Sequence, residues 1–238
     1  ENFPSYVPLK PFQKIQVQAE KNQDMIMSKG KVKALIQGVN YPLGFLDFEG
    51  FQLSIPEIKG EGPMQTIPFL FSLHGLASSH STEINHQYHI NPRDCENPYR
   101  LFCEALIKAC KPYKNLVVYN NLFENQILNR LKNRLPSYAL DIEEIQAKMI
   151  DFQPLFEQGH AYHPAQRGKI SLKAVSSSML GENLFENGGV KNGLEACKAY
   201  EFMPFIAQQE QLQSDLIQYC SMDTLAMVKL WKFLDQKI

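Results

Sequence analysis

The chain has 238 residues, of which 44% are hydrophobic and 11% aromatic, and its formal net charge is −1. This composition excludes an intrinsically disordered chain and fits one globular domain with room for an extension. A net charge near zero excludes a general attraction to polyanions, so a nucleic-acid ligand would need a local basic patch or metal ions. The strongest apolar run, residues 67–73, has only the length of a strand, so no membrane association is expected.

Cysteine usage and the first residues of the chain bear on compartment and context. The five cysteines are odd in number and no two have the CxxC spacing of a zinc site, which favours a reducing, cytoplasmic compartment. The chain starts at Glu1 without a signal-like apolar segment. We expect residues 1–40, which are polar, to form an extension or linker with one helix near 32–37. It would attach residues 41–238 to an upstream domain of a longer chain.

Three strands are expected at the start of the main domain. They cover residues 43–50, residues 66–76 and a shorter run near 87–90. A Gly- and Pro-rich loop, rather than a helix, joins the first two, so the three strands are predicted to form an antiparallel meander.

Helices dominate the rest of the chain. Helical spacing of apolar residues predicts five of them, over residues 98–109, 123–135, 141–149, 194–202 and 209–234. A β-branched run predicts a strand over 115–120, and the basic segment 160–173 is expected to be a loop. Three strands, a helix, a strand and then helices indicate an α/β fold with a mixed sheet.

Two carboxylates mark the first strand. Asp47 and Glu49 are two residues apart, so they share one face of the strand, while Leu46 and Phe48 share the other. Two acids on a largely buried strand are unfavourable unless a cation lies between them, and a hard divalent ion is the simplest occupant. An edge strand with solvated acids explains the pair equally well at this point.

Two further acids stand where sheet and helix ends converge. Glu124 lies in the first turn after the strand 115–120, where an acid also suits the positive helix N-terminus. Asp223 lies in the last helix, four residues after Tyr219 and therefore on the same face. An aspartate within an apolar helix requires a positive partner, which would be a metal ion or a basic side chain.

Together, and in this chain order, these residues resemble the motifs of the DEDD exonucleases of the ribonuclease-H-like fold. The matches are Asp47-Phe48-Glu49, then Asn120-Asn121-Leu122-Phe123-Glu124, then Tyr219 with Asp223. The second match has Glu where that group usually has Asp. The resemblance implies a ribonuclease-H-like mixed sheet in residues 41–238, with three antiparallel strands, then parallel strand additions, and flanking helices.

A closer resemblance extends over most of the chain. The runs 41–49, 67–74, 117–120, 162–165, 171–175 and 219–228 resemble a bacterial domain family of uncharacterised function that is grouped with the DEDD nucleases. Members of that family use Glu in the second motif, so Glu124 agrees with them. Gly50 departs from the family, which usually has Thr directly after the acidic pair.

The resemblance implies a metal-dependent 3′–5′ exonuclease that acts on DNA or RNA, with a single-stranded 3′ end as the expected partner. Two Mg²⁺ or Mn²⁺ ions, about 4 Å apart, would be held by four carboxylates. These ligands would be Asp47, Glu49, Glu124 and Asp223. Tyr219 would orient the attacking water, because its unperturbed pKa of about 10 makes it a poor general base.

Substrate contacts are expected near the second motif and in the basic segment. The candidate residues are Asn120, His163, Arg167, Lys169 and Lys173. Such contacts position a strand without recognising its sequence, and a solvated basic loop is the ordinary alternative. Two other functions stay open: a catalytically weak or inactive nucleic-acid-binding or scaffolding module with the same fold, and a phosphatase or other phosphoester hydrolase.

Overall fold

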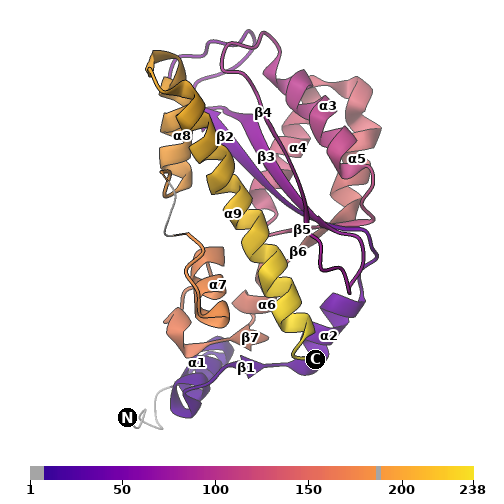
Figure 1. The fold of residues 1–238 in the computed structure, drawn as a ribbon, viewed down its shortest axis with the longest axis vertical. Coiled ribbons are helices and arrows are strands. Elements are labelled where there is room, and N and C mark those ends of the chain that lie inside the picture. The colour runs from indigo at the N-terminus through magenta and orange to yellow at the C-terminus, as the bar shows by residue number, and fades with distance from the viewer. Residues whose placement is uncertain (1–7, 186–188) are drawn as a thin grey trace.

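The computed structural model describes residues 8–185 and 189–238 and is built around a mixed five-stranded sheet (Figure 1). The strands follow the order β4-β3-β2-β5-β6. Their bounds are β2 (Leu43–Gln52), β3 (Thr66–Leu76), β4 (Asn85–Ile90), β5 (Asn115–Val118) and β6 (Met149–Asp151). β2, β3 and β4 pair antiparallel, whereas β5 and β6 join β2 in parallel. The predicted meander and the mixed α/β sheet are therefore confirmed.

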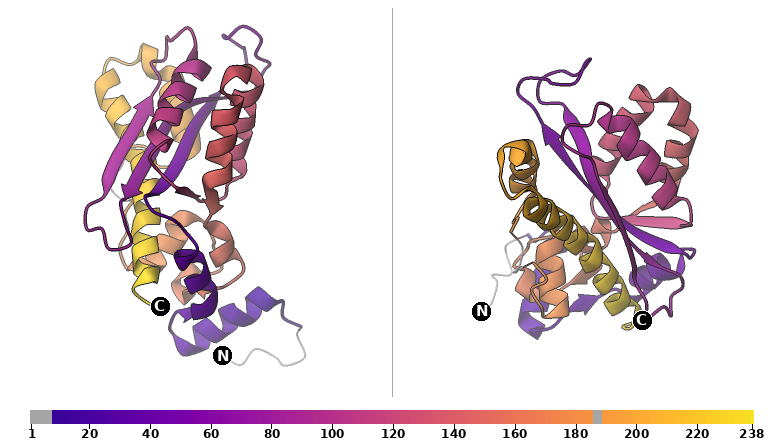
Figure 2. Two further views of the ribbon diagram at one scale, coloured as in Figure 1. Left: turned by 90° about the vertical axis from the view of Figure 1, so that its right-hand side faces the viewer. Right: turned by 45° about the horizontal axis from the view of Figure 1, so that its top comes forward.

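Helices cover both faces of this sheet (Figure 2). The long helix α9 (Gln209–Asp235) crosses one face and packs on β2 and β3. The opposite face carries α3 (Pro98–Cys110), α4 (Leu122–Arg134) and α5 (Ala139–Lys148). Short 3-10 turns are η1 (Pro136–Tyr138), η2 (Pro164–Gln166) and η3 (Met203–Phe205). The central strand β2 is thus enclosed between two helical layers.

Alternate side chains of β2 enter two different hydrophobic cores. Phe45 packs edge-on against Trp231 of α9, with ring centroids 5.9 Å apart. Phe48 points to the other face and packs edge-on against Phe102 of α3 at 5.4 Å. Because strand side chains alternate, Asp47 and Glu49 share the α9 face with Phe45. The pleat of one buried strand therefore aims two carboxylates at a helix.

The N-terminal residues pack against the end of the chain. The helix expected near residues 32–37 is present as α2 (Lys29–Gln37), and its Val32 and Ile36 are buried beside Trp231. A second helix, α1 (Pro11–Asn22), was not predicted, because its apolar residues are sparse. It is held by tertiary contacts such as the edge-on packing of Phe12 on Tyr162. The short strand β1 (Ile26–Met27) pairs antiparallel with β7 (Ala161–Tyr162).

The middle of the chain holds more regular structure than its sequence indicated. The segment 160–173, expected to be a loop, contains β7, η2 and the first two residues of α7 (Leu172–Leu180). Leu172, Val175 and Met179 are buried on one face of α7, a spacing that was open to recognition. The remaining helices are α6 (Gln153–Glu157) and α8 (Gly193–Phe202), the second of which was predicted one residue shorter.

The lengths of the helices and the state of the cysteines bear on membrane association and on disulfide bonding. Among the described residues, no helix is both long and apolar enough to cross a membrane. All five cysteines are free thiols. Burial raises the pKa of Cys103 to about 11 and that of Cys110 to about 12, so both stay protonated.

A buried polar network fixes α9 to the sheet. Thr224 Oγ1 lies 2.8 Å from Ser72 Oγ and 2.7 Å from His74 Nδ1. Ser72 Oγ also lies 3.0 Å from His86 Nε2, and the two histidine rings stack at 4.2 Å. Burial, followed by the charge of His86, lowers the pKa of His74 to about 4, so this ring is neutral at pH 7. Thr224 follows Asp223 directly, so the network positions the turn of α9 that carries this acid.

Replacing Thr224 by valine is expected to destabilise the protein by about 1–3 kcal/mol, because Ser72 and His74 lose a buried partner. Thermal unfolding should show a melting temperature lower by about 2–4 °C for each kcal/mol. Thr224→Ser keeps the hydroxyl and serves as the control. A valine variant as stable as the wild type would show that the network does not hold α9 in place.

Candidate metal centre

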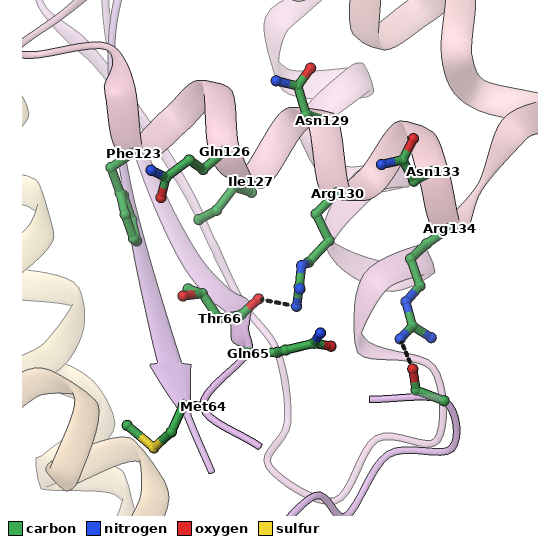
Figure 3. A pocket seen from close by; sticks show the side chains of 11 residues that line it. Met64, Gln65, Thr66, Phe123, Gln126, Ile127, Asn129, Arg130, Asn133 and Arg134 are labelled. Carbon is green, nitrogen blue, oxygen red and sulfur yellow. Dashed lines mark hydrogen bonds between the residues drawn. The ribbon is translucent and has the colours of Figure 1, made fainter. Parts of the chain in front are cut away.

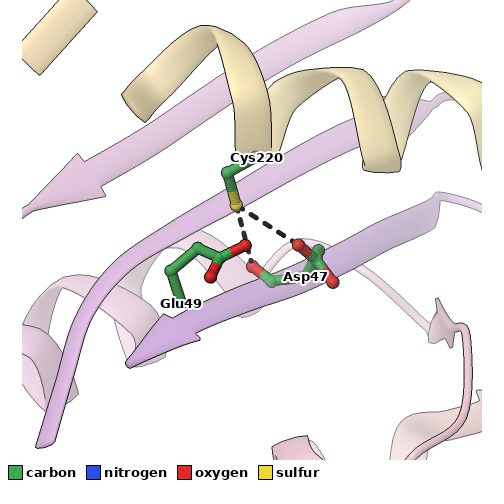
Figure 4. A group of neighbouring side chains, drawn as sticks. All are labelled: Asp47, Glu49 and Cys220. Carbon is green, nitrogen blue, oxygen red and sulfur yellow. Dashed lines mark hydrogen bonds between the residues drawn. The ribbon is translucent and has the colours of Figure 1, made fainter. Parts of the chain in front are cut away.

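Three side chains from β2 and α9 meet at the centre of the sheet (Figure 4). One ligand atom each of Asp47, Glu49 and Cys220 lies within 4.8 Å of the other two. Asp47 pairs with Ser72 across the ladder, and the register shifts between Glu49 and Gly50. This irregularity lies immediately after the acidic pair, and β2 continues beyond it to Gln52 with its pairing to β3 shifted.

Cys220 is the member of this group that sequence reasoning missed. Its thiol lies 3.4 Å from Asp47 Oδ2 and 3.7 Å from the Asp47 carbonyl oxygen. Burial, then the charges of Asp47, Glu49 and Asp223, raise the pKa of this thiol well above its ordinary range. The group is therefore a hydrogen-bond donor that orients Asp47. Its position three residues before Asp223, on one helix face, was the available signal.

Charges from three elements converge on Asp47. Burial raises the pKa of this carboxyl well above its ordinary range, and the charges of Asp223, Glu49 and Glu124 raise it further. Burial also raises the pKa of Glu49 to about 8, again with contributions from Asp223 and Glu124. For Asp223 burial raises the pKa to about 6, opposed by Lys173. Carboxylates from β2, α4 and α9 thus repel one another in a poorly solvated place.

Glu124 is buried too deeply for an ordinary helix N-terminal acid. It lies in the first turn of α4 with 3% of its surface exposed. Its Oε2 atom is buried and has no hydrogen-bond partner among the described residues. Burial, and then the charge of Asp151, raise the pKa of this carboxyl to about 8 despite a backbone hydrogen bond. An unpartnered buried carboxylate oxygen requires a proton or a cation.

Tyr219 and Lys173 border the carboxylates on the α7 side. Lys173 Nζ lies 5.0 Å from the centroid of the Tyr219 ring and donates a 2.7 Å hydrogen bond to the Lys191 carbonyl. Its charge lowers the pKa values of Glu49 and Asp223. Burial and the neighbouring acids, Glu49 first, raise the pKa of Tyr219 far above its ordinary value. The phenol therefore stays protonated and can donate a hydrogen bond, but it cannot act as a general base.

Asn120 and His163 have structural roles in this arrangement. Asn120 has a left-handed backbone with φ 64°, and its N–H donates to Asp151 Oδ1 at 2.9 Å. Asp151 also accepts from the N–H of Asn121 at 3.2 Å, which ends β5 before residue 120. His163 caps η2 by accepting from the Ala165 N–H at 3.2 Å. No hydrogen bond or ion pair in the described part of the chain joins Asn120 or His163 to the four carboxylates.

Arg167 and Lys169, also expected near a substrate, are exposed and lie on the α7 side. Together with Lys173 and Lys191 they line a cavity of about 600 Å³. Lys191 was not singled out from the sequence, because it lies 18 residues beyond Lys173 in a polar segment. The structure therefore gathers three of the five expected substrate contacts in one cavity.

A second cavity, of about 650 Å³, follows α4 on the other side of Glu124 (Figure 3). Arg130 donates to the Thr66 carbonyl at 3.2 Å and pairs with Glu61 at 3.2 Å. Arg134 also pairs with Glu61 and donates to the Gly60 carbonyl at 2.5 Å. One buried acid thus neutralises part of the arginine charge, and amide side chains line much of this cavity.

The donor set of the carboxylate cluster fits hard divalent cations. Mg²⁺ and Mn²⁺ prefer oxygen ligands, and Asp47, Glu49, Glu124 and Asp223 supply only oxygens. The unpartnered Oε2 of Glu124 and the mutual repulsion of the acids are the features that a cation would relieve. The protonated Cys220 thiol is a poor ligand for such ions and better suited to hold Asp47.

Comparison with known proteins finds a family match that contains three of the four carboxylates. The family model described as a domain of unknown function (DUF2779) matches residues 44–171, which is more than half of the chain. The match includes Asp47, Glu49 and Glu124 but ends before Lys173, Tyr219 and Asp223. A search of curated proteins gives no significant match.

Proposed function

Because the chain belongs to the DUF2779 family of domains of unknown function, we propose its function from its own residues: it is a metal-dependent 3′–5′ exonuclease of DNA or RNA. The observation that carries this proposal is the acidic pair Asp47 and Glu49 on β2, on which the charges of Asp223 and Glu124 act, together with a buried oxygen on Glu124 that has no partner among the described residues. We include in the proposal a ribonuclease-H-like fold of the DEDD type. The strand order β4-β3-β2-β5-β6, and acids on β2, on the first turn of α4 and on α9, support it.

Each residue of the site has a defined task in this proposal. The four carboxylates would hold two Mg²⁺ or Mn²⁺ ions, which supply Lewis-acid polarisation of the phosphate and lower the pKa of the attacking water when bound. Tyr219 donates a hydrogen bond from its protonated hydroxyl and so orients the water or a phosphate oxygen. Cys220 holds Asp47, and Lys173 supplies positive charge beside the departing strand.

Digestion of a 5′-labelled single strand tests the proposal. With Mn²⁺ or Mg²⁺ the purified protein should shorten the strand stepwise from its 3′ end, and EDTA should stop the reaction. Asp223→Asn removes one ligand charge with little change in volume and should prevent digestion. Intact DNA and RNA with both metals, or equal digestion by the variant, would contradict an exonuclease centred on these acids.

A binding module without turnover is the second candidate, and the packing around Gly50 favours it. A Cβ atom on Gly50 would lie 2.6 Å from Thr66 Cγ2 and 3.3 Å from Phe123 Cζ, so the usual threonine would require the Thr66 side chain to shift. Calorimetry with Mn²⁺ separates the candidates. Metal uptake by the wild type without digestion would identify a binding module, and hydrolysis of p-nitrophenyl phosphate instead of DNA or RNA would identify a phosphatase.

A further inference from the structure

We propose that a basic groove beside Tyr219 binds consecutive phosphates of a single nucleic-acid strand, so the ligand is an oligonucleotide of several residues. The basic groove is the cavity of about 600 Å³ lined by Arg167, Lys169, Lys173 and Lys191. The inference rests on the proposed function, because it supplies the path by which a strand reaches the carboxylates. It concerns binding, which is measurable without turnover.

In the described part of the chain, three of the four cations of the groove, Arg167, Lys169 and Lys191, are free to meet a ligand, whereas Lys173 already donates to the Lys191 carbonyl and contacts two aromatic rings. Within residues 8–185 and 189–238, none of its four cations forms an ion pair, and none of the described lining residues is acidic. The α4 cavity differs, since Arg130 and Arg134 there are paired with Glu61. Four unpaired cations around one cavity are suited to a polyanion, in a chain whose net charge is −1.

Hydroxyl groups and a helix end add donors to the same wall. Ser171, Ser177 and Ser178 line the groove, although the Ser178 hydroxyl already donates to the Ala174 carbonyl at 2.7 Å. Ser171 stands at the N-cap position of α7, and its side chain makes no capping hydrogen bond. Its hydroxyl, and the N–H groups of the first turn of α7, are therefore available to phosphate oxygens. Phosphate contacts commonly combine basic side chains, hydroxyls and N–H groups in this manner.

The groove adjoins a smaller pocket that contains Tyr219, the neighbour of the carboxylate cluster. Lys173 and Phe185 line both the groove and this pocket of about 130 Å³. Lys173 Nζ lies 5.0 Å from the ring centroids of Phe185 and of Tyr219. A strand with its terminal phosphodiester at the acids would pass these rings, which offer stacking surfaces for bases. Its preceding phosphates would then lie along Arg167, Lys169 and Lys191.

Salt-dependent binding of a labelled strand tests the groove. Fluorescence anisotropy with a 12-nucleotide oligothymidylate in EDTA is compared at 50 and 200 mM salt. Four phosphate contacts predict that wild-type affinity falls about 50-fold over this range. The variant Arg167→Gln/Lys169→Gln/Lys191→Gln retains one contact, so its affinity should fall only about threefold. It should also bind more weakly than the wild type at 50 mM salt.

A matched control carries the same change in net charge elsewhere. Lys29, Lys31 and Lys33 are exposed on α2, away from α7, and their triple replacement by glutamine should bind like the wild type. Equal binding by the groove variant and the wild type, equal loss in the control, or no wild-type binding at all would overturn the groove. The groove proposal would also be overturned if a trinucleotide bound as tightly as the 12-mer, because the affinity would then not depend on several consecutive phosphates.

Because EDTA prevents turnover, the binding experiment tests the groove alone, and the digestion assay tests the exonuclease proposal separately. If the strand binds through the groove but is never cut, the exonuclease proposal is contradicted and the groove proposal stands. If the groove variant cuts the strand as well as the wild type does, the groove proposal is contradicted and the exonuclease proposal stands.

Discussion

The Asp47→Asn protein is expected to unfold at a higher temperature than the wild type in EDTA, while its metal-dependent digestion of a single strand falls by about 10³-fold or more. Asp47 carries the charge that Asp223, Glu49 and Glu124 all oppose in the folded protein. Removing that charge relieves repulsion that the unfolded chain does not experience. We expect a gain of about 1–2 kcal/mol, as is common when a functional site is neutralised.

Asp141→Asn is the matched control for this effect. Asp141 is exposed in the first turn of α5, where its charge favours the helix N-terminus. The control should therefore lose a little stability and keep its activity, which is opposite to Asp47→Asn in both respects. If Asp47→Asn instead melts lower in EDTA, the carboxylate stabilises the fold, and the cluster is not a site whose charges await a cation.

The fold was largely predictable where one strand or helix shows its own pattern. Alternation along residues 43–49 and the loop before residue 66 were enough to predict the meander, and helical spacing located α3, α4 and α9. β6 and α1 escaped prediction because their structure depends on distant partners. β6 has three residues, pairs in parallel with β5, and carries Asp151, which accepts N–H groups from the turn after β5.

Sequence spacing indicated which acids share a face, but not the contact of Cys220 or the electrostatics of the candidate site. The periodicity of a strand predicts that Asp47 and Glu49 share one face, and the periodicity of a helix predicts the same for Tyr219 and Asp223. The contact of Cys220 with Asp47 joins positions 173 residues apart, and only the packing of α9 on β2 determines it. The unpartnered oxygen of Glu124 is likewise a property of burial that no spacing reveals.

The melting temperature of the metal-free protein is expected to fall as the pH rises from 7 to 8. Glu49 and Glu124 have pKa values of about 8 in the folded protein, against an ordinary value of 4.5, mainly because both are buried. Between these values the folded state binds more protons than the unfolded state, so stability decreases with pH. The contribution is fully present below pH 4.5 and is lost as the pH passes through about 8.

The expected size follows from the same linkage. One carboxyl with a folded pKa of about 8 loses about 1 kcal/mol of stabilisation between pH 7 and 8, which lowers the melting temperature by about 2–4 °C. His74 and His86 contribute little in this window, because both are already neutral when folded and nearly neutral when unfolded. Scanning calorimetry of wild type, Glu49→Gln and Glu124→Gln in EDTA would measure the slope, and each variant should be flatter than the wild type.

Mn²⁺ should oppose this fall of the melting temperature with pH. A cation competes with protons for the same carboxylates, so the stabilisation that it provides increases as the acids ionise between pH 7 and 8. The difference in melting temperature with and without Mn²⁺ should therefore widen with pH in the wild type and shrink in Glu124→Gln. A wild-type melting temperature that is flat from pH 7 to 8 in EDTA, or a Mn²⁺ effect that does not depend on pH, would mean that these acids ionise without a penalty from burial or from one another. In that case the unfavourable ionisation that a bound cation would relieve, and on which the metal proposal depends, would be absent.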